Sequence, residues 1–113
     1  MEPLMDKRPW GNFKQFTHND PTTVKIITVE AHQQLSLQYH HKRTEFWKIL
    51  SGAGWIQIGD EKIEVKKGDE FVIKPEEKHR VGAESEPIEF LEISYGDFDE
   101  NDIVRLEDKY GRV

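Results

Sequence analysis

Cysteine is absent from the 113 residues of this chain. Without thiols the protein forms neither disulfide bridges nor thiolate metal sites, so nitrogen and oxygen atoms must hold any bound metal. A cysteine-free sequence also fits a reducing compartment. The first residues lack the basic start and apolar run of a signal peptide, and no apolar stretch is long enough to span a membrane. We therefore expect a soluble, cytoplasmic protein without a membrane partner.

Positive charge is also scarce. Lys and Arg number 16 against 22 Asp and Glu, the net charge is -6, and no basic stripe is present that would neutralise a run of phosphates. Nucleic acid is therefore not an expected partner. Hydrophobic residues make up only 35% of the chain, so the core must be lean. We expect one domain over residues 1–113, with an N-terminal arm at 1–9 and a C-terminal extension at 97–113.

A helical period of useful length is missing as well. Alternating and β-branched stretches recur instead, separated by Gly, Pro, Asn and Asp turn signals. The expected strands cover residues 22–30, 34–40, 45–50, 55–58, 62–65, 71–73, 79–82 and 88–95. Short strands at this spacing favour an all-β sandwich or barrel. For residues 97–113 we expect a short helix or turn.

One expected strand carries an unusual polar face. Gln38 and His40 are two residues apart, so on a strand their side chains point the same way. Glu45 follows after a four-residue turn, and His79 arrives far downstream. Amide, imidazole and carboxylate atoms together suit a borderline or hard divalent metal. Although adjacent histidines are often only part of a solvated loop, the spacing predicts a metal site whose ligands are Gln38, His40, Glu45 and His79.

These residues resemble the two motifs of the cupin double-stranded β-helix, an all-β jelly-roll sandwich. The matching residues are Gln38, His40, Glu45 and Gly52 in the first motif, and Gly68 and His79 in the second. The chain departs from the family pattern at three positions. His32 and Glu76 stand where the family has glycine, and Lys74 stands where it has proline. The resemblance implies a single cupin domain.

A closer resemblance covers nearly the whole chain. Residues 8–11, 35–47 and 102–112 resemble the type II mannose-6-phosphate isomerase domain, which is commonly fused behind a mannose-1-phosphate guanylyltransferase. The glycine-rich nucleotide loop of that transferase is absent from this sequence, so we do not expect guanylyl transfer. The resemblance implies a metal-dependent aldose–ketose isomerase that interconverts mannose 6-phosphate and fructose 6-phosphate through an enediol.

Such a reaction needs a cation, a proton-transferring base and a positive pocket for the phosphate. The implied cofactor is one divalent metal ion, with Zn expected as purified and Co, Mn or Mg as alternatives. We expect Arg43 and His41 to be catalytic. The expected substrate-binding residues are Arg80, Lys42, Arg8 and Arg112. For the base the sequence leaves His41, Lys48, Glu92 and a metal-bound water open.

Two other functions fit the same residues. One is a cupin acting on another sugar phosphate or a nucleotide sugar, and the other is a non-catalytic sugar-binding module in polysaccharide biosynthesis. The expected oligomeric state follows from the N-terminal aromatic residues.

Trp10, Phe13 and Phe16 form an aromatic cluster near the start of the chain. Because exposed aromatic clusters usually mark contact surfaces, we expect a homodimer.

Overall fold

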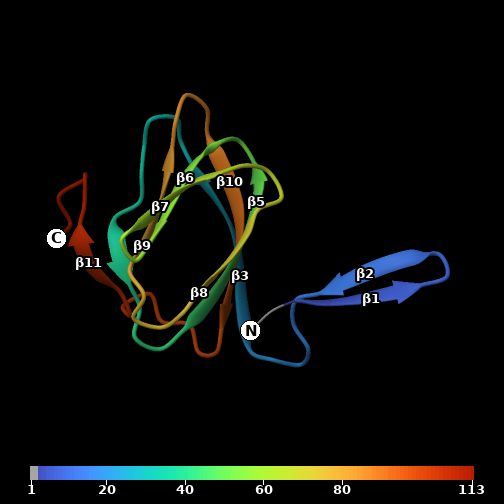
Figure 1. The fold of residues 1–113 in the computed structure, drawn as a ribbon. Helices are drawn as coiled ribbons and strands as arrows, with labels where there is room; N and C mark the ends of the chain where they lie inside the picture. The colour runs from blue at the N-terminus through green and yellow to red at the C-terminus, as the bar shows by residue number, and fades with distance from the viewer. Residues whose placement is uncertain (1–2) are drawn as a thin grey trace.

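The computed structural model describes residues 3–113, and every regular element in that range is a β-strand (Figure 1). The strands are β1 (Leu4–Arg8), β2 (Gly11–Gln15), β3 (Thr22–Val29), β4 (Leu37–Tyr39), β5 (Thr44–Ser51), β6 (Gly54–Ile58), β7 (Glu61–Val65), β8 (Glu70–Ile73), β9 (His79–Ala83), β10 (Ile88–Tyr95) and β11 (Val104–Glu107). Residues 3–113 thus contain no helix able to cross a membrane. The all-β prediction is confirmed.

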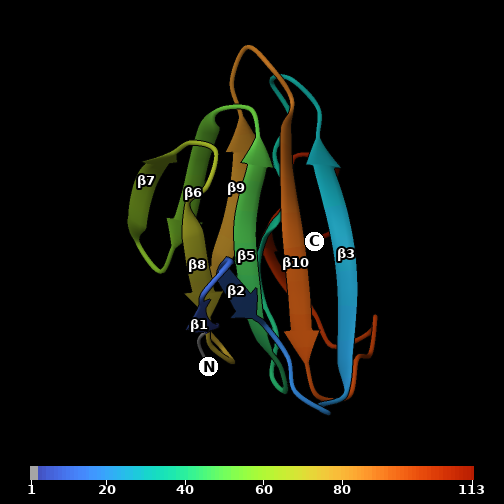
Figure 2. The same cartoon turned by 90° about the vertical axis from the view of Figure 1, so that its right-hand side faces the viewer.

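The body consists of two antiparallel sheets packed face to face (Figures 1 and 2). One sheet has the strand order β3-β10-β5-β8, and the other has the order β11-β4-β9-β6-β7. Strands that follow one another in the chain often lie in opposite sheets, so the chain winds around a shared interior. This arrangement is the predicted double-stranded β-helix.

The interior between the sheets is apolar over most of its length. Its buried side chains include Trp47, Ile49 and Phe90 from the first sheet and Ile56 and Val81 from the second. These residues lie on strands whose side chains alternate between faces, as the sequence pattern predicts. The apolar packing leaves one end of the interior for polar residues, and that end holds the candidate site.

The outer face of the first sheet carries a second apolar cluster. Phe46, Ile93 and Tyr95 are buried there, and Phe16 covers them. The ring centroids of Phe16 and Phe46 are 5.3 Å apart, and the Tyr95 hydroxyl donates to the Phe16 carbonyl at 2.9 Å. Phe16 therefore anchors the chain that leads from the N-terminal strands into the body.

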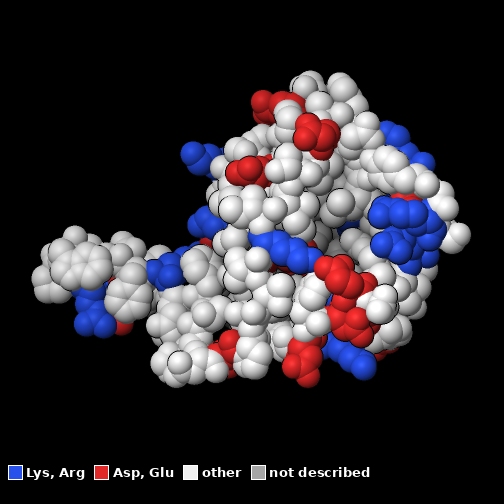
Figure 3. Space-filling model, turned by 180° about the vertical axis from the view of Figure 1, so that it is seen from behind, with Lys and Arg blue, Asp and Glu red and all other residues white. Residues whose placement is uncertain are grey.

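The first two strands form a hairpin that projects from the body (Figures 1 and 3). We expected a polar arm at 1–9; residues 1 and 2 of it lie outside the described residues, and residues 4–9 belong to this hairpin of residues 4–15. Trp10 at the turn is 74% exposed and Phe13 is 36% exposed. Of the three expected contact aromatics, only Phe16 is packed on the sandwich.

Backbone conformation explains the motif glycines and their replacements. Gly52 has φ of +84°, and a Cβ there would lie 2.1 Å from the Pro87 carbonyl oxygen. His32 and Glu76 adopt φ values of 62° and 64°, in the left-handed region that glycine favours. The two non-glycine residues thus keep the left-handed turns expected at the glycine positions of the family pattern.

The C-terminal extension differs from the expected short helix or turn. After a turn around residues 99–101, the chain forms β11, which pairs with β4. The three-residue β4 would otherwise be an edge strand with unpaired backbone groups, and β11 satisfies them. This pairing brings residues from the end of the chain to the polar end of the interior.

Candidate metal centre and adjoining cavity

Three segments from both sheets bring the predicted ligands together. Gln38 on β4 lies directly opposite His79 on β9, so their side chains share a face. His40 comes just after β4, two residues beyond Gln38. Glu45 lies on β5 of the facing sheet. Strand pairing and sheet packing therefore direct these residues to the same end of the interior.

His40, Glu45 and His79 form a compact buried cluster. One ligand atom from each lies within 4.8 Å of the others, and the residues are 4%, 1% and 0% exposed. Glu45 Oε1 and His79 Nε2 are 3.5 Å apart, and both are buried without a hydrogen-bond partner in the described part of the chain. Buried polar atoms nearly always have a partner, so a cation bound between them would satisfy both.

The imidazole tautomers favour metal binding too. His40 Nδ1 lies 2.6 Å from the Asp102 carbonyl oxygen, and His79 Nδ1 lies 2.8 Å from the Glu77 carbonyl oxygen. Because a carbonyl oxygen only accepts, each Nδ1 must carry a proton and donate. In the neutral ring Nε2 is then unprotonated and carries the lone pair that a metal ligand requires.

Burial keeps these rings neutral. Desolvation lowers the pKa of both His40 and His79 below the ordinary 6.5, and it outweighs the backbone hydrogen bonds and the nearby Glu45 charge, which raise them. Neutral imidazoles with unprotonated Nε2 atoms and a carboxylate fit a divalent cation such as Zn²⁺. The residues present therefore suit the metal site that the sequence predicts.

Gln38, the fourth predicted ligand, is half-buried and lines a cavity of about 160 Å³ next to the cluster. This cavity opens between the two sheets. Its polar lining comprises Lys25, Gln38, His40, Arg43, Glu92, Glu100 and Arg105. A larger hollow of about 450 Å³ lies at the base of the hairpin, but its lining contains none of the predicted ligands. We therefore take the smaller cavity as the candidate site.

Arg43 lines this cavity and is almost fully buried. Its Nε donates to Glu45 Oε2 at 2.9 Å, and its Nη2 donates to His40 Nε2 at 3.2 Å. The guanidinium also lies over the Phe98 ring, 4.5 Å from the centroid. The predicted catalytic arginine thus contacts two of the predicted ligands and faces the cavity.

Glu92 is the buried acid of the cavity. Burial, together with the nearby Glu45 charge, raises the pKa of its carboxyl from 4.5 to about 7. The Ser94 hydroxyl lies 3.4 Å from Glu92 Oε1 and 3.5 Å from Glu45 Oε2, between the two acids. A carboxyl that titrates near neutral pH is suited to exchanging protons with a bound molecule.

His41, the other predicted catalytic residue, points away from the cavity. Its side chain is 51% exposed, its ring stands edge-on to Tyr39, and its Nδ1 lies 3.6 Å from the Glu76 carboxylate. Lys42 beside it is also exposed. The Asp102 carboxylate accepts hydrogen bonds from the backbone N–H groups of both residues, at 2.9 and 3.0 Å. These hydrogen bonds fix Asp102, whose carbonyl oxygen in turn accepts the hydrogen bond from His40 Nδ1.

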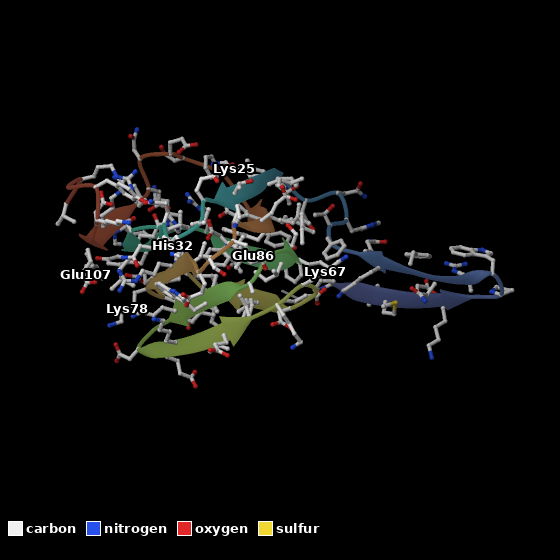
Figure 4. The ribbon with its side chains drawn as sticks, turned by 90° about the horizontal axis from the view of Figure 1, so that it is seen from above. Lys25, His32, Lys67, Lys78, Glu86 and Glu107 are labelled. Carbon is white, nitrogen blue, oxygen red and sulfur yellow. The ribbon has the colours of Figure 1, made fainter. Side chains whose placement is uncertain are left out.

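The predicted substrate-binding arginines lie outside the cavity lining. Arg80 follows His79 on β9, so it points to the opposite face, where it donates to Gln57 and pairs with Glu107 at 3.2 Å. Glu107 lies at the periphery of the body (Figure 4). Arg8 is on the projecting hairpin, paired with Asp6, and Arg112 is near the C-terminus, paired with Asp108.

Sequence reasoning did not single out two cations of the cavity, Lys25 and Arg105. Lys25 lies opposite Glu92 in the β3–β10 pair, and Arg105 lies opposite Gln38 in the β11–β4 pair. Lys25 is a lone charge among the apolar residues Val24, Ile26 and Ile27 of a predicted strand, and this is a signal that could have indicated it. Arg105 depended on the pairing of β11 with β4, which no local pattern revealed.

A two-sheet antiparallel sandwich with a His-Glu-His cluster at one end of its interior defines the protein as a cupin. A solved cupin protein from Bacteroides fragilis superposes with a TM-score of 0.60 at 31% identity, over 77% of this chain and 87% of that one. More narrowly, the chain belongs to the family described as "Mannose-6-phosphate isomerase C-terminal", whose profile matches residues 5–108. The resemblance seen in the sequence is thereby confirmed.

Two curated relatives are similar over most of this chain. It is 37% identical over 108 residues to the xanthan biosynthesis protein XanB of Xanthomonas campestris pv. campestris (strain B100). It is 36% identical over 108 residues to the alginate biosynthesis protein AlgA of Pseudomonas aeruginosa. Each alignment covers 94% of this chain but only 23% and 22% of the relatives, so the chain spans less than a quarter of their length.

Proposed function

We propose that this protein is a metal-dependent aldose–ketose isomerase that interconverts mannose 6-phosphate and fructose 6-phosphate in the cytoplasm. The observation that carries the proposal is an orphaned pair of buried ligand atoms, Glu45 Oε1 and His79 Nε2, next to a cavity whose lining includes Glu92, an acid with a pKa raised to about 7. Membership of the mannose-6-phosphate isomerase C-terminal family supports the choice of sugar phosphate.

The residues that would hold the metal are His40, Glu45 and His79, with Gln38 as a fourth ligand from the same strand face as His79. A bound divalent cation would polarise the C1 and C2 oxygens of an open-chain sugar, as Lewis-acid catalysis requires. Asp102 and Glu77 hold the two imidazoles in the binding tautomer through their backbone carbonyls. Arg43, beside the ligands, supplies positive charge for an enediolate oxygen.

Glu92 is our choice of base among the four that the sequence left open. It lines the cavity, whereas His41 points outward and Lys48 pairs with Glu70 at 3.2 Å. The Glu92 carboxylate would remove the proton from C2 of the aldose and return it to C1, while the hydroxyl proton moves in the same direction, from O2 to O1. The raised pKa lets the same group accept and release a proton near pH 7.

The experiment that tests this function begins with protein purified without chelator. Bound metals are measured, and conversion of mannose 6-phosphate to fructose 6-phosphate is assayed with added cobalt, zinc, manganese or magnesium. We expect metal-dependent turnover that His40→Ala abolishes together with metal binding. Glu92→Gln should bind metal normally and lose at least about 100-fold in kcat, the usual contribution of a general base.

His41→Ala is the matched control for a histidine next to the site but outside the cavity. It should keep metal binding and most of the turnover. Bound metal without turnover in the wild type would exclude the isomerase, and it would favour action on another sugar phosphate or a sugar-binding module. Failure to bind any divalent metal would exclude all three of these functions.

We also propose that the protein is a homodimer in which the hairpin of one copy covers the outer sheet face of the other. Val24 and Ile26 on the edge strand β3 are 57% and 62% exposed, and they lie opposite Ile93 and Leu91 on the outer face. An isolated two-stranded hairpin is only marginally stable in water, so this one needs a surface to pack on. Its exposed side chains Leu4, Met5, Trp10 and Phe13 would supply the apolar area.

A further inference from the structure

One arginine of this chain differs from the other four in having no partner for its guanidinium within the described residues. Arg8, Arg43, Arg80 and Arg112 each form an ion pair with a carboxylate, at 3.1, 2.9, 3.2 and 2.6 Å respectively. Within residues 3–113, the Arg105 side chain forms no hydrogen bond or ion pair, and its Nε is buried without a partner. A buried guanidinium nitrogen that lacks an acceptor is costly, so this side chain is suited to an acceptor from outside the chain.

Strand pairing directs Arg105 into the candidate site. It lies opposite Gln38 on β4, and Gln38 lies opposite His79 on β9. Residues opposite one another in antiparallel strands share a face, so the three side chains form a row across the sheet. Arg105 thus lines the cavity at one end of this row, and the metal cluster lies at the other end.

The other charged groups of the cavity are already engaged or differently suited. Lys25 lies over the Phe98 ring and donates at 3.2 Å to Glu100, the second acid of the lining, so these two opposite charges pair with each other. Arg43 is held by Glu45 and His40. The raised pKa of Glu92 reduces the negative charge that would oppose an anion at neutral pH. Arg105 is therefore the cation of this cavity that is best able to bind an anion through two hydrogen bonds.

We propose that Arg105 binds the phosphomonoester of the substrate, with its guanidinium fork donating two hydrogen bonds to the phosphate oxygens. Arginine matches phosphate in this geometry better than lysine does, because its donors are planar and fixed. The identity of the sugar rests on the proposed function. The anion site itself is inferred from the unpartnered Arg105 guanidinium. Arg105 holds the phosphate end, while the carbonyl end reaches the metal ligands and Glu92.

The test uses inorganic phosphate as the probe and isothermal titration calorimetry on the full chain at low ionic strength. Arg105→Gln should weaken phosphate binding by about 10- to 100-fold, the usual effect of losing a charge-assisted hydrogen-bond pair. Arg105→Lys should recover part of it and also covers the case in which the glutamine variant fails to fold. Arg80→Gln is the matched control, since it removes an arginine from the other face of the same sheet, and its binding should equal wild type.

Wild-type protein that binds no phosphate, or an Arg80→Gln variant that loses as much affinity as Arg105→Gln, would overturn the proposal. Competition by sugars tests the anion site separately from the proposed isomerase function. Mannose 6-phosphate should compete with phosphate in wild type, whereas mannose should not. If turnover is present, Arg105→Gln should raise KM for the sugar phosphate far more than it lowers kcat. If turnover is absent, Arg105-dependent phosphate binding would show that the anion site stands while the isomerase assignment fails.

Discussion

Arg43 forms a buried ion pair with Glu45, with Nε 2.9 Å from Oε2, although the two residues are only two apart in the chain. The side chains are 8% and 1% exposed. Arg43 also donates to His40 Nε2, so one cationic side chain engages two of the three residues in the metal cluster. A divalent cation and the Arg43 guanidinium would therefore share the Glu45 carboxylate and the His40 Nε2 atom.

Arg43→Gln should destabilise the metal-free protein and increase its response to metal. Removing one partner of a buried ion pair typically costs about 3–5 kcal/mol, because the other charge stays buried. A bound divalent metal would then neutralise Glu45. Metal at a hundredfold excess over its Kd adds about 2.7 kcal/mol to the free energy of unfolding. Denaturant unfolding with and without zinc measures both effects, and the gain from zinc should be larger in the variant than in wild type.

Arg80→Gln serves as the control for that measurement. Its partner Glu107 is 63% exposed, so the loss should be below about 1 kcal/mol and independent of zinc. Equal zinc stabilisation of wild type and Arg43→Gln would mean that Arg43 and the metal do not share ligands.

Glu92→Gln should change how stability depends on pH. The pKa of Glu92 is about 7 in the folded protein and near 4.5 when unfolded, so the folded state keeps a proton that the unfolded state releases between these values. Wild type therefore loses stability from this group as pH rises from 4.5 to about 7, and the variant does not. The free energy of unfolding of Glu92→Gln minus that of wild type should grow across this window and level off above it.

The two buried histidines have the opposite dependence. Their lowered pKa values mean that stability is lost as pH falls below 6.5. This contribution is present in both proteins and cancels in the difference. A difference that stays constant from pH 4.5 to 7 would contradict the assignment of Glu92 as a buried, neutral-range acid.

Two glycine substitutions should separate backbone strain from steric clash. Gly52 and Gly68 both have positive φ, at +84° and +94°, but only Gly52 would place a Cβ against backbone, 2.1 Å from the Pro87 carbonyl oxygen. Gly68→Ala should cost about 1–2 kcal/mol from conformational strain alone. Gly52→Ala should cost clearly more, because the β5–β6 turn must move. Thermal unfolding of the two variants side by side measures this, and equal losses would contradict it.

The hairpin should mediate self-association. Sedimentation of the wild type at low micromolar concentration should show about twice the chain mass of 13.3 kDa. Replacing Trp10 and Phe13 by serine should yield monomers, and so should replacing Val24 and Ile26 by threonine, because these residues form the two proposed contact surfaces. Leu106→Ser, at an exposed leucine on β11, is the control and should remain dimeric. A wild-type species of 13.3 kDa would refute the dimer.

Much of the fold could be predicted from the sequence, because alternation and turn chemistry are local. The predicted strands at 22–30, 45–50 and 88–95 match β3, β5 and β10 to within one residue at each end. Strand 34–40 was overextended: only Leu37–Tyr39 forms β4, and Gln34 makes an isolated bridge. Residues 4–15 were not predicted as a hairpin, since their polar, proline-flanked sequence carries little strand pattern.

The sequence by itself determined which residues could bind a metal, since the spacing of Gln38 and His40 on one strand face and the absence of cysteine are properties of the chain alone. Only the tertiary structure decided which charges reach that site. Strand alternation turns Arg80 outward although it is next to His79, and the pairing of β11 with β4 brings Arg105 inward from the far end of the chain. Cations are placed by register between distant strands, and no local pattern encodes that register.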